Sequence, residues 1–312
     1  MARPRAILLM GPTGSGKTEA AVALAARFPL GIVSVDSAMV YRGMDIGTAK
    51  PPRELLARAP HRLVDLIDPA ESYSAARFVA EATLAMEEIA AAGRTPLLAG
   101  GTMLYFRALQ SGLARLPAAD AALRRRIDER AAREGWQALH AELARLDPAA
   151  AARIRPGDRQ RIQRALEVIA ITGAPISSQQ RQDLRGAATP TDLRLVLAPA
   201  DRAEHAARLA RRFEAMMAQG LLDEVRALRA RGDLHAGMPS IRLIGYRQLW
   251  AHLEGQCTLE EAVQQAIVAT RQYARRQLTW LRAEPGAEWF DAFDPGVVER
   301  LAERIRTFLA TP

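Results

Sequence analysis

Cysteine and long apolar runs are scarce in this 312-residue chain. Cys257 is the only cysteine, so an intramolecular disulfide and a zinc site built from several cysteines are both excluded. No stretch reaches the roughly 20 consecutive apolar residues of a membrane span, and no apolar segment with a cleavage site follows the first residues. We therefore expect a cytoplasmic protein that does not enter a membrane.

Lysine is almost absent from a chain that is otherwise rich in positive charge. Of the 43 basic residues only Lys17 and Lys50 are lysines, and the formal net charge is +8. Because an ammonium is compact and sits on a flexible stem, we expect both positions to require that geometry. The basic balance favours a polyanionic partner such as a nucleic acid, although the aromatic content of 5% predicts no stacking platform for single strands.

A glycine-rich segment near the start of the chain organises the rest. Residues 11–18, GPTGSGKT, fit the pattern G-x-x-x-x-G-K-[ST]. The segment lies between an apolar run at 6–9 and a helix-forming run at 19–27, and in this context the pattern predicts a phosphate-binding loop. Backbone N–H groups and a helix N-terminus would face the phosphates, Lys17 would add a mobile charge, and the Thr18 hydroxyl would ligate Mg²⁺. The predicted phosphate-binding residues are Gly11, Pro12, Thr13, Gly14, Ser15, Gly16, Lys17 and Thr18.

Further short runs of β-branched and apolar residues predict the strands of a parallel sheet, at 31–35, 61–65, 95–99 and 194–198. Helices are predicted at 75–92, capped by Ser74, and at 103–110, while 38–51 reads as a loop. Asp36 and Thr102 follow two of the strands, so both should lie near the phosphate loop at the carboxyl edge of the sheet. For Asp36 a general base, a Mg²⁺ ligand and a helix cap remain open.

Strand patterns disappear between 115 and 192, where alanine, arginine and helix signals predominate. We predict an α/β fold with a P-loop NTPase-like parallel sheet core, an inserted all-helical domain and C-terminal helices. The predicted parts are 1–114, 115–192 and 193–312.

Arginines gather on three predicted helices. A helix at 158–171 carries Arg161 and Arg164, and a long helix at 202–231 carries Arg212. A helix at 259–282 carries a basic stripe, and no acidic residue lies between Glu261 and Glu284. The stripe comprises Arg271, Arg275 and Arg282, with Arg276 beside it. Solvent-exposed faces normally mix both signs of charge, so this stripe predicts contact with a nucleic acid, and Arg212 is one of several arginines that could close over the phosphates.

These motifs together resemble the tRNA dimethylallyltransferase family. The resemblance runs through GPTGSGKT at 11–18, DSAMVYRGMDIGTAKP at 36–51, GGTMLYFRAL at 100–109, RIRPGDRQRIQRALEV at 153–168, DEVRALRARGDLH at 223–235, PSIRLIGYRQ at 239–248 and ATRQYARRQLTWLR at 269–282. It implies transfer of a dimethylallyl group from dimethylallyl diphosphate to N6 of adenine 37, next to the anticodon of tRNA. It also implies a channel that the two substrates enter from opposite ends.

The resemblance implies a role for each matching residue. Asp36 would be the general base, Thr102 and Lys17 would lie at the reacting centre, and Arg212 would join the phosphate loop at the diphosphate. Met39 and two loop positions, Arg155 and Gly157, depart from the family's common pattern. The implied tRNA contacts are Asp36, Ser37, Ala38, Met39, Thr102, Arg124, Gln160, Arg161, Ile162, Gln163, Arg164, Arg242, Leu243, Ile244, Gly245, Tyr246, Arg247, Arg275, Arg276, Gln277, Leu278, Thr279, Trp280, Leu281 and Arg282.

Three other functions compete with this interpretation. The phosphate loop alone predicts a small-molecule or nucleotide kinase in which Asp36 activates a hydroxyl and ATP occupies the loop. An enzyme that prenylates free adenine nucleotides is disfavoured by the basic helix at 259–282. A non-enzymatic RNA-binding GTPase or ATPase is disfavoured because no apolar run ending in aspartate follows at a typical later strand. We expect Mg²⁺ as the cofactor and a monomer.

Overall fold

The structure is a computed structural model that describes residues 3–112, 114, 116–182 and 192–311. Two compact units divide the chain: Met1–Phe106 with Thr189–Pro312, called the core unit here, and Arg107–Ala188, called the insertion unit. The sequence alone placed the limits of the insertion at 115 and 192. Residue 115 and the stretch 183–191 lie outside the described residues.

The core unit is built on a parallel sheet of six strands in the order β3-β2-β4-β1-β5-β6. The four inner strands, β2, β4, β1 and β5, are largely buried because helices cover both faces of the sheet. The strands are β1 (Ile7–Met10), β2 (Leu30–Val35), β3 (His61–Arg62), β4 (Thr95–Gly100), β5 (Leu193–Ala198) and β6 (Glu288–Asp291).

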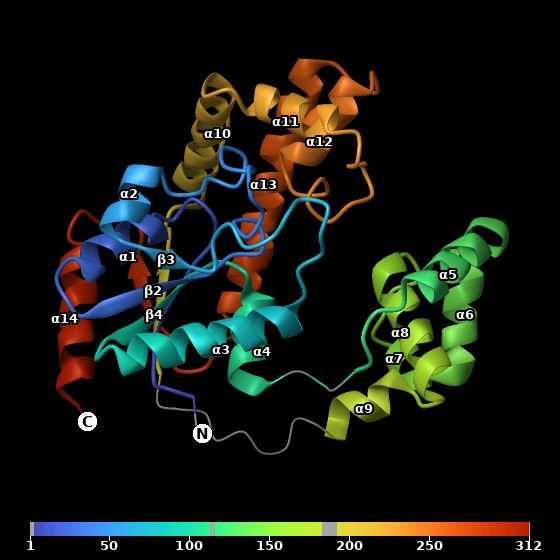
Figure 1. Cartoon of the computed structure of the whole chain (residues 1–312), viewed down its shortest axis with the longest axis horizontal. Coiled ribbons are helices and arrows are strands. Elements are labelled where there is room, and N and C mark those ends of the chain that lie inside the picture. Colours follow the sequence, from blue (N-terminus) through green and yellow to red (C-terminus); the bar gives the residue numbers. More distant parts are fainter. Residues whose placement is uncertain (1–2, 113, 115, 183–191, 312) are drawn as a thin grey trace. The chain divides into compact units, whose positions relative to one another are not determined.

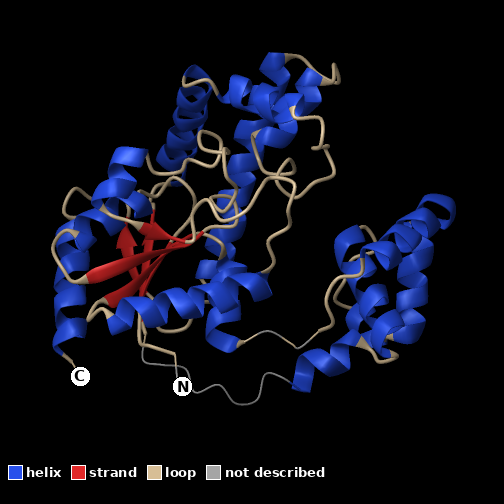
Figure 2. Ribbon diagram, viewed as in Figure 1, coloured by secondary structure: helices blue, strands red, loops and turns tan. Residues whose placement is uncertain are grey.

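Helices α1 and α14 cover one face of the sheet, and α3 covers the other (Figures 1 and 2). Gly31 in β2 permits the approach of α3, because a Cβ there would lie 2.7 Å from Ile89 side-chain atoms. The helices of the core unit are α1 (Lys17–Ala25), α2 (Arg53–Arg58), α3 (Ala75–Ala91), α4 (Met103–Ser111, which runs across the boundary between the units), α10 (Arg202–Ala218), α11 (Leu221–Ala230), α12 (Tyr246–Leu253), α13 (Leu259–Leu281) and α14 (Val297–Ala310).

A second apolar cluster joins α10, α11, α12 and α13 to the loop at 38–51. Figure 1 shows these four helices gathered together, apart from the helices that cover the sheet. Phe213, Leu221, Tyr246 and Ile267 bring one side chain each from the four helices into this cluster. The C-terminal helices therefore hold a loop that starts at the end of β2.

The described part of the insertion unit, 107–112, 114 and 116–182, contains helices and no strand. Its core comes mainly from α5, α6, α7 and α8. The apolar spacing of Ile162, Ala165, Leu166 and Ile169 predicts one buried face on α8; the first three are buried and Ile169 is partly buried. The helices that follow α4 are α5 (Ala121–Glu134), α6 (Trp136–Leu146), α7 (Pro148–Ala151), α8 (Arg159–Thr172) and α9 (Ile176–Gln182). The α/β class and the helical character of this segment agree with the prediction.

Several predicted elements are confirmed, and others are wrong. Ser74 caps α3 by accepting a hydrogen bond from the Arg77 N–H at 3.1 Å. The single long helix predicted at 202–231 is two helices, because Gly220 adopts a left-handed conformation with φ of 98° between α10 and α11. The strand predicted at 61–65 ends at Arg62, since Leu63 and Asp65 also have positive φ.

The sequence spacing also predicts one apolar stripe on α3 through Phe78, Leu84 and Ile89, and this prediction is partly wrong. Leu84 is 60% exposed, and the buried face is formed by Phe78, Ala82, Met86 and Ile89. Helices α2 and α12 and strand β6 were not predicted. Among the described residues, no helix is long and apolar enough to cross a membrane.

Candidate active site

The register of the sheet explains why the predicted site residues meet. Met10 in β1 and Val35 in β2 both pair with Gly100 in β4, so three strands end at the same level. The loops that follow them begin at residues 11, 36 and 101 and leave the same edge side by side. A cavity of about 750 Å³ opens there within the core unit, and α10 and α13 complete its wall.

The phosphate loop forms the floor of this cavity. Gly14 and Gly16 each have φ of 76°, which a residue with a side chain rarely adopts, and α1 begins immediately afterwards. Lys17 Nζ folds back to donate to Pro12 O at 2.6 Å and to Ser15 Oγ at 3.4 Å. Burial lowers the pKa of Lys17 to about 8 against the opposing field of Asp36. The loop thus holds a cation whose hydrogen bonds go to neutral oxygens, which suits a phosphate ligand.

Arg212 reaches the same loop from α10. Its Nη1 donates to Thr13 Oγ1 at 3.2 Å, and burial lowers its pKa while Glu19 and Asp36 oppose that effect. Of the α10 arginines, Arg212 hydrogen-bonds the loop, whereas Arg208, which also lines the cavity, lies over the Phe293 ring. Two cations, from α1 and α10, converge on the wall that carries the backbone N–H groups.

Asp36 lines the cavity at the end of β2. Its Oδ1 accepts a hydrogen bond from the Ala38 N–H at 2.8 Å. Burial raises the pKa of Asp36, and the Ala38 N–H, Lys17 and Arg212 only partly offset this. A carboxylate with a raised pKa binds a proton more tightly, which is the property required of a general base.

Thr102 lies beside Asp36 and fixes the loop that carries it. Its Oγ1 accepts a hydrogen bond from the Ser37 N–H at 3.0 Å, and its own N–H donates to Val35 O at 3.2 Å. Tyr273, which was not predicted, also lines the cavity. Burial, with a smaller contribution from Asp36, raises its pKa to about 12 although Thr102 hydrogen-bonds it. Its phenol therefore stays protonated near neutral pH.

The residues around Thr18 fit a metal shared with a phosphate ligand. Thr18, Glu19 and Asp36 line the cavity together, and no group of three or more His, Cys, Asp or Glu side chains that could hold a metal exists among the described residues. Mg²⁺ commonly takes only one or two protein oxygens and completes its shell with phosphate oxygens and water. A hydroxyl and a carboxylate beside a phosphate loop meet that requirement.

The predicted tRNA contacts of the core unit fall into two groups. On α13, Arg275, Arg276, Thr279, Trp280 and Arg282 are exposed or partly exposed, and Arg242, Leu243, Ile244, Arg247 and Arg276 line the cavity. Tyr246 and Leu281 are fully buried and Gln277 is 4% exposed, so the prediction of direct tRNA contacts from these three side chains is corrected: they contact other parts of the protein. Arg271 is likewise engaged with the protein, because its Nε donates to Ala206 O at 3.3 Å.

In the insertion unit, two of the predicted RNA-binding arginines surround a buried carboxylate. Arg124 Nε and Arg164 Nη1 donate to Glu167 at 2.8 Å and 2.6 Å, and the Glu167 side chain has no exposed surface. Ile162 is also fully buried, so its predicted contact is corrected to packing. The Arg161 side chain is 67% exposed and lies 3.5 Å from Asp158, which leaves it facing solvent.

Lys50, the second lysine, is a structural clamp. Its Nζ lies 2.6 Å from Asp45 Oδ1, 2.5 Å from Asp65 Oδ1 and 2.6 Å from Tyr41 O, and its side chain is 3% exposed. Three oxygens converge on one nitrogen, which suits an ammonium better than a planar guanidinium. Lys50 therefore joins the loop at 38–51 to the segment after β3.

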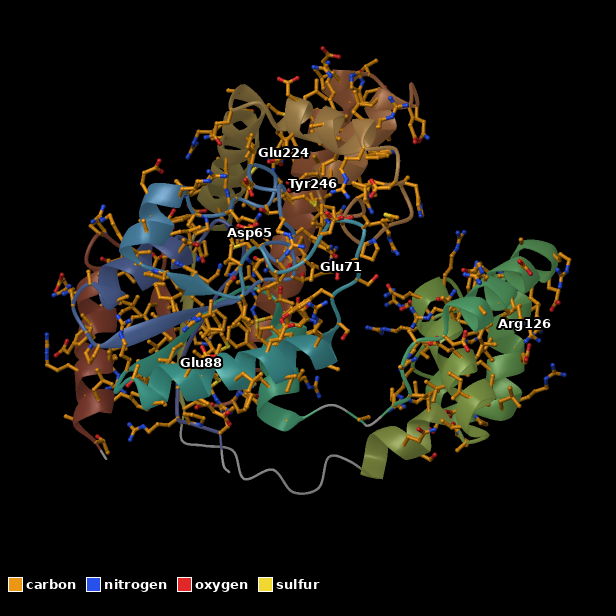
Figure 3. The ribbon with its side chains drawn as sticks, viewed as in Figure 1. Asp65, Glu71, Glu88, Arg126, Glu224 and Tyr246 are labelled. Carbon is orange, nitrogen blue, oxygen red and sulfur yellow. The ribbon has the colours of Figure 1, made fainter. Side chains whose placement is uncertain are left out.

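Glu224 holds the same loop from the other side and was not predicted. Its carboxylate accepts hydrogen bonds from the N–H groups of Asp45 and Ile46, both at 2.8 Å, and from that of Gly47 at 3.2 Å. Tyr246 Oη donates to it at 2.5 Å, and the labelled side chains lie close together in Figure 3. In the sequence Glu224 is indistinguishable from an acidic residue in the first turn of a helix, so no local signal reveals this role.

Comparison with known proteins gives matches over nearly the whole chain. A family model described as IPP transferase matches residues 39–284, and one described as isopentenyl transferase matches residues 4–64. A tRNA dimethylallyltransferase of Bordetella petrii is 58% identical over 306 residues, which cover 97% of this chain and 98% of that protein.

Solved structures agree with the family models. The full-length tRNA isopentenylpyrophosphate transferase from Bacillus halodurans aligns with a TM-score of 0.70 and 37% identity, covering 99% of this chain and 96% of that one. A eukaryotic dimethylallyltransferase acting on tRNA aligns with a TM-score of 0.81, covering 98% of this chain and 80% of that one. At 24% identity the second similarity supports the fold alone.

Proposed function

This chain belongs to the IPP transferase family, whose matched relatives are tRNA dimethylallyltransferases, and we propose the corresponding reaction for it. The enzyme transfers a dimethylallyl group from dimethylallyl diphosphate to N6 of adenine 37, next to the anticodon, and forms N6-dimethylallyladenosine. The observation that carries this proposal is that cations suited to a diphosphate and a carboxylate suited to act as a base line the same cavity. Lys17 and Arg212 lie at the phosphate loop, and a carboxylate of raised pKa, Asp36, lies in the same cavity.

The phosphate loop binds the diphosphate of the donor. As the bond between C1 and oxygen breaks, its electron pair leaves with the diphosphate, and the backbone N–H groups, Lys17 and Arg212 stabilise the growing negative charge. Mg²⁺, held by Thr18 and phosphate oxygens, would neutralise part of the same charge. The acceptors of Lys17, Pro12 O and Ser15 Oγ, are neutral, so anionic phosphate oxygens would be the stronger acceptors for the same ammonium.

Asp36 completes the reaction at the other substrate. The N6 amine of adenine attacks C1, a bond between N6 and C1 forms, and the proton lost from N6 goes to the Asp36 carboxylate. Thr102 and the Ala38 N–H hold the segment 36–38 so that this carboxylate faces the cavity. The adenine must leave the anticodon stack to reach it, at a cost of a few kcal/mol.

Exposed basic residues supply the surface for the RNA. Arg275, Arg276 and Arg282 on α13 face solvent, and Arg276 also lines the cavity, so the basic face of this helix is continuous with the reacting centre. In the insertion unit, Arg161 and Gln160 are the exposed members of the predicted set. We propose that the enzyme acts as a monomer and that it acts on tRNA in the cytoplasm.

The direct test is the choice of donor. Purified protein is incubated with Mg²⁺, unmodified tRNA and either labelled dimethylallyl diphosphate or labelled ATP. We expect label in the tRNA from the prenyl donor only, at the adenine beside the anticodon. Turnover of ATP with a hydroxyl-bearing acceptor and no label in tRNA would support a kinase instead.

A further inference from the structure

Thr13, in the middle of the phosphate loop, is held at each of its polar groups by a side chain from a distant helix. Its N–H donates to Gln277 Oε1 at 2.8 Å, its carbonyl lies 2.9 Å from His205 Nε2, and its hydroxyl accepts from Arg212 at 3.2 Å. Burial lowers the pKa of His205, so the ring is neutral and its Nε2–H donates to the carbonyl. The Thr13 N–H consequently points toward α13 and is already hydrogen-bonded.

Gln277 does more than occupy this N–H. The other end of its amide, Nε2, donates to Gly101 O at 2.8 Å, and the residue is 4% exposed. A Cβ on Gly101 would lie 2.3 Å from this nitrogen and 3.0 Å from Gly11 O, so glycine is required for the amide to fit. One planar amide therefore joins the loop after β1 to the loop after β4, with both ends of the bridge satisfied.

The two loops joined by Gln277 position groups with different roles in the proposed reaction, namely the cation that binds the leaving group and the residue that holds the base. The loop after β1 presents Lys17 to the diphosphate, whereas the loop after β4 carries Thr102, which holds the Ser37 N–H next to Asp36. Their separation sets the distance between the leaving group and the base. A fixed bridge between them is what a displacement reaction requires, because the reacting atoms must be aligned within a fraction of an ångström.

Resting on the proposed function, we propose that Gln277 is a positioning residue that fixes the spacing of the diphosphate loop and the Gly101–Thr102 loop. It acts through its amide and does not touch the tRNA. Neighbouring residues on α13 divide the remaining tasks: Tyr273 and Arg276 line the cavity, and Arg275 faces solvent. One helix thus presents a basic surface on one side and aligns the catalytic loops on the other.

The test compares Gln277→Met with Gln265→Met on the same helix. Methionine fills a similar volume but forms neither hydrogen bond, while Gln265 is exposed and serves as the matched control. We expect Gln277→Met to lower kcat about 10- to 100-fold at saturating substrates and to weaken binding of inorganic pyrophosphate with Mg²⁺. The Kd for tRNA should stay close to that of wild type, the Tm should fall by a few degrees because two backbone groups lose their hydrogen-bond partner, and Gln265→Met should match wild type throughout.

A second variant breaks the same bridge from the opposite loop. Gly101→Ala pushes the amide aside without altering α13, so it decides the question if Gln277→Met does not fold. Retention of kcat within threefold in either folded variant overturns the proposal, as does a loss confined to tRNA affinity. If the wild-type protein itself transfers no prenyl group, the proposed function fails. The pyrophosphate titration still reports whether Gln277 orders the loop.

Discussion

Two groups of charged side chains, those that line the cavity and those around Glu167, differ in their surroundings. In the cavity, Lys17, Asp36 and Arg212 form hydrogen bonds with neutral groups, and burial shifts the pKa of each toward its uncharged form. In the insertion unit, Glu167 is enclosed by two arginines. Burial alone would raise its pKa, but hydrogen bonds from Arg124 and Arg164 outweigh burial and lower it.

This difference in ionic partners distinguishes charged residues with a catalytic role from those that stabilise the fold. A buried charge without an ionic partner destabilises the folded protein and is retained where a ligand will supply the missing charge. A buried charge enclosed by partners stabilises the fold and has little left to offer a ligand. We therefore assign catalysis to the cavity set, structure to the Glu167 set, and tRNA binding to arginines that are exposed and belong to neither.

Removing the base should give the largest effect. Asp36→Asn keeps the shape of the side chain but cannot accept the proton from N6, so we expect kcat to fall by about 10²- to 10⁴-fold. Pyrophosphate binding should persist, and Tm should be unchanged or higher because a buried charge is removed. Single-turnover transfer assays with a thermal melt check both. Activity within tenfold of wild type would contradict the role given to Asp36.

Removing exposed charges on α13 should act on tRNA alone. Arg275→Ala combined with Arg282→Ala should weaken tRNA binding and reduce the log–log salt slope by roughly one unit for each RNA phosphate that the variant no longer neutralises. Titrations over a range of salt concentrations measure this. The control removes the same charge from α14 with Arg300→Ala and Arg306→Ala. An equal change in the control, or an unchanged slope in the α13 variant, would exclude this helix from the interface.

Breaking the Glu167 network should destabilise the protein without altering the chemistry. Glu167→Gln leaves two arginines without their carboxylate, at a cost of about 2 kcal/mol. Because the folded-state pKa of Glu167 lies below its unfolded value, the stabilisation is fully present above the unfolded pKa and is lost as pH falls through the folded pKa. The difference in Tm between wild type and variant should therefore narrow from pH 7 to pH 4. A constant gap would mean that charge is not the cause.

The smallest predicted effect separates two arginines on one helix. Arg161→Ala should weaken tRNA binding a few-fold with little change in Tm, because its side chain is exposed. Arg164→Ala should instead lower Tm, since its guanidinium bonds Glu167 and Pro117 O. Binding and melting data for the pair provide the comparison, and the reverse pattern would show that Arg164 is released to bind RNA.

The sequence predicts the site better than it predicts what holds the site together. The phosphate loop, Asp36 and the central strands carry local signals, namely glycine spacing and apolar runs, and the structure brings them to one sheet edge. Lys50 could be singled out by composition, but its partners Asp45 and Asp65 are set by left-handed turns that local patterns do not show.

Interactions between distant segments could not be predicted either, because local sequence patterns do not show them. Gln277 and Glu224 bond to segments 264 and 177 to 179 residues away, and each looks like an ordinary polar residue of its helix. Gly220 could have indicated the end of α10, but helix-forming residues on both sides led to the prediction of one continuous helix. Strand β6 is short and partly exposed, so its apolar signal is weak.

The central claim is that the loop around Lys17 binds the leaving group of a prenyl donor. Calorimetric titration of an unreactive thiolodiphosphate analogue of dimethylallyl diphosphate, with tRNA and Mg²⁺ present, tests it most directly. We predict binding to wild type, loss of binding in Lys17→Ala and no competition by ATP. ATP that binds more tightly than the analogue and displaces it from the loop would contradict the account.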